Sequence, residues 1–155
     1  MPQRDAIHET VKQALISDGW QITDDPFVIP YGKRFLYADL GAVEANPPHQ
    51  SGEQIIGAQC GSRRIAVEIK DFRRQSPIAD LEQAIGQYVL YGLLLNRVDP
   101  ECEIYLAIAD EVYSTLFSEP IGEVVISDLP LRLIVVNLEN AEVQQWIPSR
   151  PIVMS

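Results

Sequence analysis

The sequence predicts a single α/β (α+β) domain in which helices pack on a mixed central sheet. Its 155 residues suit one domain, and 46% hydrophobic with 22% charged residues can fill a single core. Segments with helical and strand patterns follow the order helix, strands, helix, strand, helix, strands. That alternation favours a mixed sheet, and we assign residues 1–155 to one domain because no internal repeat occurs.

The N-terminal part predicts one helix followed by strands. Apolar residues recur at helical spacing from Arg4 to about Ser17, and Asp18-Gly19 supplies a stop signal. The next segments are rich in strand formers, and a turn is expected from Gly41. Three extended pieces are expected, at residues 20–22, 27–29 and 35–42.

A long connection is expected at residues 44–62. It contains Asn46-Pro47-Pro48 and Ser51-Gly52, which favour turns over regular structure. Connections of this length are usually functional or mobile. We therefore expect a loop or hairpin excursion from the domain.

The centre of the chain predicts a strand and then a long helix. In Arg64–Phe72, Ile65, Val67 and Ile69 share one face, which leaves Glu68 and Lys70 on the other. Pro77 then opens a helix that runs from about Ile78 to Asn96. One stripe of this helix carries four hydrogen-bonding side chains, Asp80, Gln83, Gln87 and Tyr91.

The C-terminal third alternates again between the two patterns. Residues 103–109 form a continuous apolar run typical of a strand, and residues 111–117 predict a short helix. Two further strands are expected at residues 123–126 and 131–138. Trp20 and Trp146 are most simply anchors of a core or an interface.

Charge and cysteine content exclude several classes of protein. A net charge of −10 argues against a general polyanion binder, although Lys33–Arg74 is locally basic, with seven basic and five acidic residues. The two cysteines, Cys60 and Cys102, support neither a disulfide framework nor a zinc site. No apolar run is long enough to span a bilayer and no signal-peptide core is seen, so we expect a soluble, cytoplasmic protein.

Three charged side chains predict a site at the end of the sheet. Glu68 and Lys70 are expected about 6.5 to 7 Å apart on one strand face. Because a lone buried charge is costly, the two side chains would either form an ion pair or bind a metal ion and a phosphate. Asp39 follows an apolar strand and precedes a glycine by two positions. Asp39 and Glu68 would suit Mg²⁺ or Mn²⁺, which prefer oxygen ligands. Lys70 would neutralise charge on a scissile phosphate or help deprotonate the attacking water.

Asp39 followed by Glu68-x-Lys70 resembles the PD-(D/E)xK nuclease motif, with Ala38 in place of its proline. The resemblance implies a restriction-endonuclease-like αβββαβ core with extra C-terminal strands. It also implies a metal-dependent endodeoxyribonuclease, or an ancestor with that activity. A structural ion pair of Glu68 with Lys70, and a capping role for Asp39 at the turn, stay open as alternatives.

Three more residues match positions of the same superfamily. Gln87-x-x-x-Tyr91 resembles an element that some of these nucleases carry on the helix after the ExK strand. Glu9 matches an acidic position on the first helix and would be an outer metal ligand. For Tyr91 a core position is equally expected. Glu9 is more simply a residue favoured by the helix dipole, and His8 an interior or surface histidine.

Six segments in order carry a closer resemblance, Arg4–Trp20, Tyr37–Ala42, Ile65–Phe72, Asp80–Tyr91, Glu103–Tyr113 and Gln144–Ile147. Together they resemble the XisH family, the fdxN element excision controlling factors of cyanobacteria. The resemblance implies a role in programmed excision of a DNA element by a site-specific recombinase. It implies as partners that recombinase, a second factor similar to XisI, and DNA.

Three functions stay open at this point. The first is a non-catalytic accessory that controls recombination through a partner, the second is a Mg²⁺-dependent endonuclease or nickase, and the third is an interaction scaffold of nuclease ancestry. The acidic charge opposes tight, autonomous DNA binding at physiological salt, so the accessory role is favoured. A homo-oligomer is compatible with all three.

Overall fold

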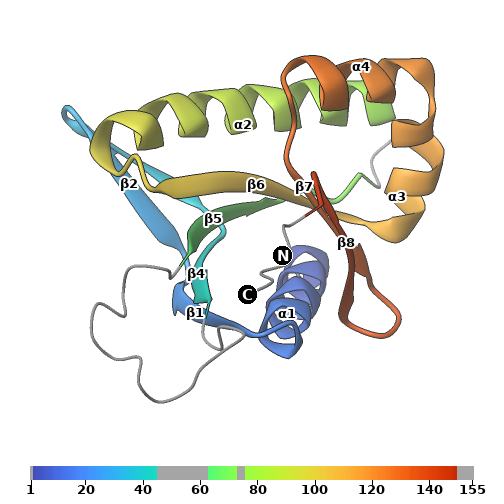
Figure 1. Ribbon diagram of the computed structural model, residues 1–155, viewed down its shortest axis with the longest axis horizontal. Coiled ribbons are helices and arrows are strands. Elements are labelled where there is room, and N and C mark those ends of the chain that lie inside the picture. Colours follow the sequence, from blue (N-terminus) through green and yellow to red (C-terminus); the bar gives the residue numbers. More distant parts are fainter. Residues whose placement is uncertain (1, 45–62, 73–75, 150–155) are drawn as a thin grey trace, which may run out of the picture.

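The computed structural model describes residues 2–44, 63–72 and 76–149, and Figure 1 shows their arrangement. The helices are α1 (Pro2–Ser17), α2 (Pro77–Val98), α3 (Asp110–Thr115), the 3-10 helix η3 (Leu116–Ser118) and α4 (Pro120–Asp128). The strands are β1 (Trp20–Asp24), β2 (Phe27–Tyr31), β3 (Arg34–Ala38), β4 (Leu40–Glu44), β5 (Arg64–Ile69), β6 (Cys102–Ala109), β7 (Leu133–Asn137) and β8 (Glu142–Ile147).

A six-stranded mixed sheet forms the centre, in the order β1-β4-β5-β6-β7-β8. β5, β6 and β7 are parallel neighbours, while β1, β4 and β8 join as antiparallel strands. β2 and β3 form a separate two-stranded hairpin. The predicted mixed sheet with added C-terminal strands is therefore confirmed.

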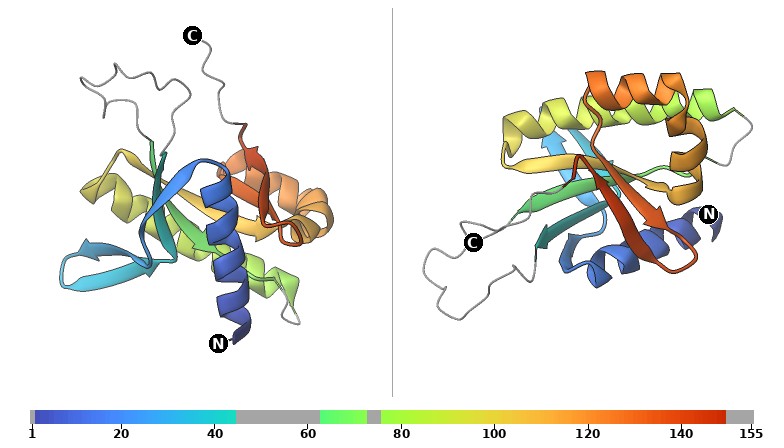
Figure 2. Two further views of the ribbon diagram at one scale, coloured as in Figure 1. Left: turned by 90° about the horizontal axis from the view of Figure 1, so that it is seen from below. Right: turned by 45° about the vertical axis from the view of Figure 1, so that its right-hand side comes forward.

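Helices cover both faces of this sheet. α1 lies against one face, and α2 with α4 lies across the other (Figures 1 and 2). Alternate residues of β5 pack into the hydrophobic cores on the two faces of the sheet. Ile65 and Val67 join the core beneath α1, whereas Ala66 joins the core beneath α2. The strand that carries Glu68 is thus covered on both sides.

Aromatic rings close the α1 side of the sheet. Trp146 of β8 packs against Trp20 of β1 with ring centroids 5.4 Å apart, and against Tyr105 of β6 at 5.2 Å. Its indole N–H donates to Asp18 Oδ2 at 3.1 Å, at the end of α1. Both tryptophans therefore serve as core anchors, as predicted.

On the other face of the sheet, Tyr88 of α2 binds the segment that precedes β7. Its hydroxyl donates to the carbonyl of Pro130 at 3.3 Å and accepts from the backbone N–H of Arg132 at 3.0 Å. One buried side chain of α2 thereby holds the segment that leads into β7.

Two predictions in the C-terminal third were wrong or incomplete. Residues 123–126, expected as a strand, lie inside α4, whose helix starts at Pro120. Proline at the first helical position favours that start, and tertiary packing overrides the strand preference of Val124, Val125 and Ile126. The final strand, Glu142–Ile147, was not predicted.

The expected single strand at residues 35–42 is divided at Asp39 into β3 and β4. Gly41 therefore lies inside a strand, and the turn expected there was wrong. A Cβ at this position would come within 2.6 Å of the Phe27 ring, so close packing explains the glycine.

The excursion expected at residues 44–62 falls almost wholly outside the described residues, as does Cys60. No helix in the described part of the chain is long and apolar enough to cross a membrane.

Candidate functional site

The strand β5 delivers two charged side chains to the α2 side of the sheet. Glu68 follows the alternation of Ala66 and is 7% exposed. Two residues later, beyond the end of β5, Lys70 donates through Nζ to Gln83 Oε1 of α2. The two charges therefore face the helix, as their spacing predicts, and Lys70 bonds to the helix.

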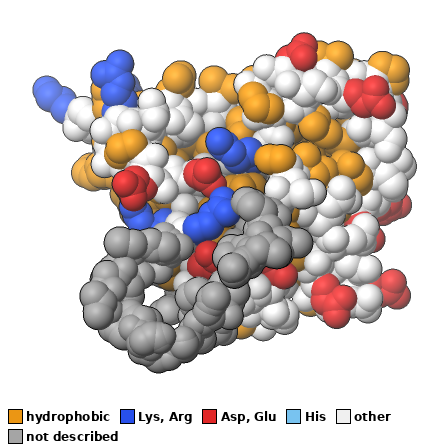
Figure 3. All heavy atoms as spheres, in the orientation of Figure 1, with side chains coloured by type: hydrophobic (Ala, Val, Ile, Leu, Met, Phe, Trp, Pro, Cys, Tyr) orange, Lys and Arg blue, Asp and Glu red, His pale blue; other side chains and the backbone are white. Residues whose placement is uncertain are grey.

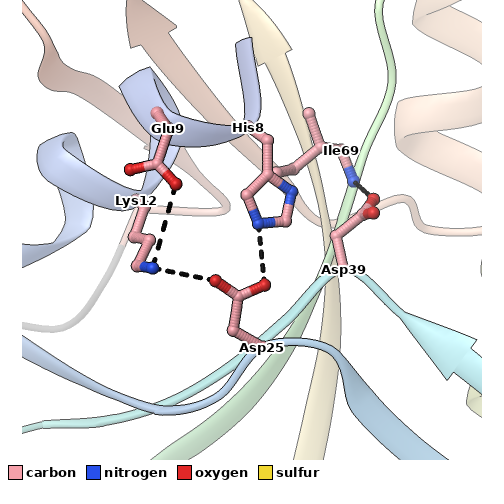
Figure 4. Close-up of polar contacts among 6 residues, drawn as sticks. All are labelled: His8, Glu9, Lys12, Asp25, Asp39 and Ile69. Atoms are coloured by element: carbon pink, nitrogen blue, oxygen red, sulfur yellow. Dashed lines mark hydrogen bonds and ion pairs between the residues drawn. The ribbon is translucent and has the colours of Figure 1, made fainter. Parts of the chain in front are cut away.

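Asp39 reaches β5 from the bend between β3 and β4. The antiparallel ladder of β4 and β5 ends at the pair of Leu40 with Val67, and Asp39 directly precedes this pair on one strand while Glu68 follows it on the other. Asp39 is 8% exposed, and its carboxylate accepts from the backbone N–H of Ile69 at 2.7 Å (Figure 4). Asp39 thus caps the end of the ladder with a side-chain acceptor.

The α2 stripe brings polar groups over this sheet end. Ser76 caps the helix by accepting from Ala79 N at 3.1 Å, which sets where the stripe begins. Asp80 is buried at the start of the stripe, and Tyr91 is buried further along. Between them, Gln83 and Gln87 contact Lys70 and Tyr91 respectively.

The pKa of Tyr91 depends on the groups that surround it at this end of the sheet. Burial raises the pKa of its phenol, and the negative charges of Glu68 and, to a lesser degree, Asp39 raise it further. A hydrogen bond with Gln87 acts in the opposite direction without outweighing them. Tyr91 is therefore protonated at neutral pH and shares one electrostatic environment with both acids.

Glu9, the third acid predicted for a metal, lies apart from the other two. It is exposed on α1, with its carboxylate turned toward Lys12 at 3.9 Å, and His8 lies between it and Asp39 in Figure 4. Asp39 and Glu68 share the surroundings of Tyr91, whereas the ion pair of Glu9 is with Lys12 of its own helix.

An ionic cluster beside the site was not expected from the sequence. Asp25 Oδ1 lies 2.9 Å from His8 Nε2, and Asp25 Oδ2 accepts from Lys12 Nζ at 2.8 Å. Burial acts to raise the pKa of Asp25, but the contacts with Lys12 and His8 together lower it. The cluster fastens α1 to the turn between β1 and β2. Its only sequence signal is the one-turn spacing of His8 and Lys12.

The donor set limits what metal could bind. Within residues 2–44, 63–72 and 76–149, no group of three or more His, Cys, Asp or Glu side chains is arranged for a metal ion. Asp39 and Glu68 still fit Mg²⁺ or Mn²⁺, because these ions commonly take one or two carboxylates and complete their shell with water and substrate phosphates. Lys70, Gln83 and Tyr91 could then bind phosphate oxygens from the α2 side.

Comparisons with known proteins agree with one another. The model of the XisH protein family matches residues 1–144. The crystal structure of an fdxN element excision controlling factor protein from Anabaena variabilis is 34% identical with a TM-score of 0.76, and the match covers 92% of this chain and 98% of that one. An XisH family protein from Nostoc punctiforme is 32% identical with a TM-score of 0.74, over 91% and 98% of the two chains. No curated protein matches.

Proposed function

Since the chain belongs to the XisH family, we propose that it is a controlling factor for programmed excision of a DNA element, acting as an accessory to a site-specific recombinase. The observation that carries this proposal is the similarity, over nearly the whole of both chains, to a protein described as an fdxN element excision controlling factor. In this role the recombinase makes the DNA breaks. The accessory changes when, or how efficiently, they are made.

The partners of this role are a recombinase, a second factor similar to XisI, and DNA. The charge of −10 supports contact through proteins, because phosphate binding depends on Lys and Arg displacing counterions. An acidic chain would then reach DNA mainly as part of a complex.

The site at the sheet end supports descent from a PD-(D/E)xK nuclease. The main-sheet elements and their two long helices follow the chain order α1, β1, β4, β5, α2, β6, which is the helix, three strands, helix, strand order of that superfamily. Asp39 and Glu68 are both buried, and both act on the pKa of Tyr91 of α2. A buried carboxylate is costly unless it is hydrogen-bonded, paired with a cation or bound to a metal.

A second candidate function, a metal-dependent endonuclease or nickase, follows from the same residues. Asp39 and Glu68 would hold a Mg²⁺ or Mn²⁺ ion, which lowers the pKa of a bound water. Lys70, oriented by Gln83, would offset negative charge on the scissile phosphate. Tyr91, protonated at neutral pH and contacted by Gln87, would donate to a phosphate oxygen.

Co-purification tests the accessory role. The tagged chain is expressed together with a XisI-like protein and the recombinase, and both are expected to be retained by the tag. Retention of neither would contradict the role. Asp128→Asn alters an exposed side chain on α4 and serves as the control variant, which should retain both partners as the parent does.

Nicking assays separate the second candidate from the first. Single-stranded, duplex and branched DNA are incubated with the protein and Mn²⁺, alongside Glu68→Gln. Metal-dependent cleavage that this substitution abolishes would establish the endonuclease. Absence of cleavage together with normal partner binding supports the accessory. If Asp39→Ala/Glu68→Ala behaves like the parent in both assays, an interaction scaffold of nuclease ancestry is favoured over the endonuclease.

A further inference from the structure

We propose that the outward face of the β2–β3 hairpin binds unpaired nucleotides of a DNA strand, with bases stacked on Phe35 and Tyr37 and phosphates held by Lys33 and Arg34. This surface is separate from Asp39 and Glu68. The inference goes beyond the proposed function, because it assigns to this chain a surface that contacts DNA directly, whereas the accessory role works through protein partners.

The hairpin stands out from the main sheet and has two different faces (Figure 2, left). Ile29 pairs with Leu36, and both pack into the core beneath α2. The neighbouring pairs, Val28 with Tyr37 and Pro30 with Phe35, alternate to the opposite face. One face therefore anchors the hairpin and the other is presented outward.

The outward face is an apolar patch of four adjacent side chains. Phe35 is 62% exposed, Tyr37 54% and Val28 43%, and Pro30 is exposed beside them. Single exposed apolar residues are ordinary, but cross-strand neighbours exposed together mark a binding surface. Aromatic side chains make up the larger part of this one.

The cations at the tip favour a polyanionic partner. Gly32, with φ of +61°, and Lys33 form the two-residue loop, and Arg34 begins β3 opposite Tyr31. Residues 26–38 contain these two cations and no Asp or Glu, in a protein of net charge −10. Figure 3 shows the same asymmetry, with Lys and Arg gathered toward the side where Figure 1 draws β2 and with Asp and Glu frequent at the opposite edge.

The geometry suits unpaired bases better than duplex DNA. Phe35 and Tyr37 are two positions apart on one strand face, about 6.5 to 7 Å along the chain. Aromatic rings displayed on strands in this way stack with successive bases of single strands, whose ring faces are accessible. Phosphate contacts alone would not require exposed rings.

Binding of a labelled oligothymidylate of about 20 nucleotides, followed by fluorescence anisotropy at low salt, tests the proposal. Phe35→Ser/Tyr37→Ser is expected to weaken binding by about tenfold or more. Leu93→Ser/Val124→Ser, at equally exposed apolar positions of α2 and α4, should bind as the parent does. Lys33→Gln/Arg34→Gln should reduce the slope of log K against log salt by about 1.4, as expected for two lost phosphate contacts.

Several outcomes would overturn the proposal. They are no binding by the parent at low salt, unchanged binding by the hairpin variants, or equal loss in the α2/α4 control. A change in sedimentation of Phe35→Ser/Tyr37→Ser from dimer to monomer would instead identify the patch as an interface between copies. Exposed Glu82→Gln on α2 should leave oligonucleotide binding intact. Oligonucleotide binding is measured on this protein alone and the excision role with its partners, so failure here and failure of the excision role can be told apart.

Discussion

The carboxylate of Asp39 accepts a 2.7 Å hydrogen bond from the backbone N–H of Ile69. This bond continues the β4–β5 ladder one step beyond its last main-chain pair, Leu40 with Val67. A side chain thus replaces a carbonyl where the chain divides between β3 and β4. The acid at the candidate site is also part of the sheet.

Replacing Asp39 should therefore reduce stability in a graded way. Asp39→Ala leaves the N–H of Ile69 without this acceptor and should lower the free energy of unfolding by about 1–3 kcal/mol. Asp39→Asn keeps an acceptor oxygen and should cost less. Urea unfolding measures both, with exposed Asp128→Ala within about 0.5 kcal/mol of the parent. Equal losses for Ala and Asn would contradict the bond.

The pKa of Tyr91 should depend on Glu68. The phenol is buried beside this carboxylate, which raises its pKa above the usual value, so Glu68→Gln should lower the pKa. Glu82→Gln, on the exposed side of the same helix, should not change it. NMR titration of ring-labelled tyrosine measures the three proteins. If the pKa of Tyr91 is the same in Glu68→Gln as in the parent, the electrostatic interaction between Tyr91 and Glu68 is contradicted.

The same shift predicts how stability depends on alkaline pH. The folded pKa of Tyr91 is raised, so its contribution is complete below the unfolded pKa of about 10 and is lost as pH rises toward the folded value. Tyr91→Phe removes the titrating group and should flatten this part of the stability profile. An identical alkaline decline in the parent and in Tyr91→Phe would assign it to other residues.

Tyr88→Phe should lower the free energy of unfolding by about 1 to 3 kcal/mol. The substitution removes the hydroxyl that joins Pro130 and Arg132 and leaves both backbone groups without it. Tyr37→Phe, which alters an exposed hydroxyl, should be nearly neutral. Thermal and urea unfolding compare the two. A neutral Tyr88→Phe would show that water replaces the hydroxyl.

The thiol of Cys102 should be inert in the folded protein. Burial, with smaller effects of nearby acids, raises its pKa to about 11, so little thiolate exists at pH 8. In a Cys60→Ser background, reaction with a thiol-specific disulfide reagent should be slow under native conditions and fast in denaturant. Rapid native labelling would contradict the buried environment of Cys102 on β6.

Much of the fold could be predicted because local patterns and packing agree. Ile65, Val67 and Ile69 alternate as a strand, and Pro77 opens a helix after Ser76, which supplies the cap. The pattern at Val124–Ile126 was misleading, since three apolar residues in a row fit either a strand or a helix. Only the tertiary context, with Pro120 at the start and the packing of Val125 and Ile126 against the α2-side core, decides for the helix.

In the candidate site, too, some features follow from local sequence patterns and others depend on the tertiary structure. The spacing of Glu68 and Lys70 and the stripe through Gln87 and Tyr91 follow from strand and helix periodicity, so the sequence places them on common faces. The contact of Lys70 with Gln83 depends on where α2 crosses the sheet, which no local pattern encodes. Contacts between segments far apart in the chain, such as His8 with Asp25, are hidden from the sequence for the same reason.

The proposed accessory role can be measured directly as excision in a reconstituted system. A plasmid carrying a DNA element between two recombination sites is incubated with the recombinase and the XisI-like factor, with and without this protein. We predict that the protein changes the excised fraction several-fold and that exposed Glu82→Gln acts as the parent does. An excised fraction that stays the same with and without the protein, at saturating amounts of both partners, would contradict a role of this protein in excision.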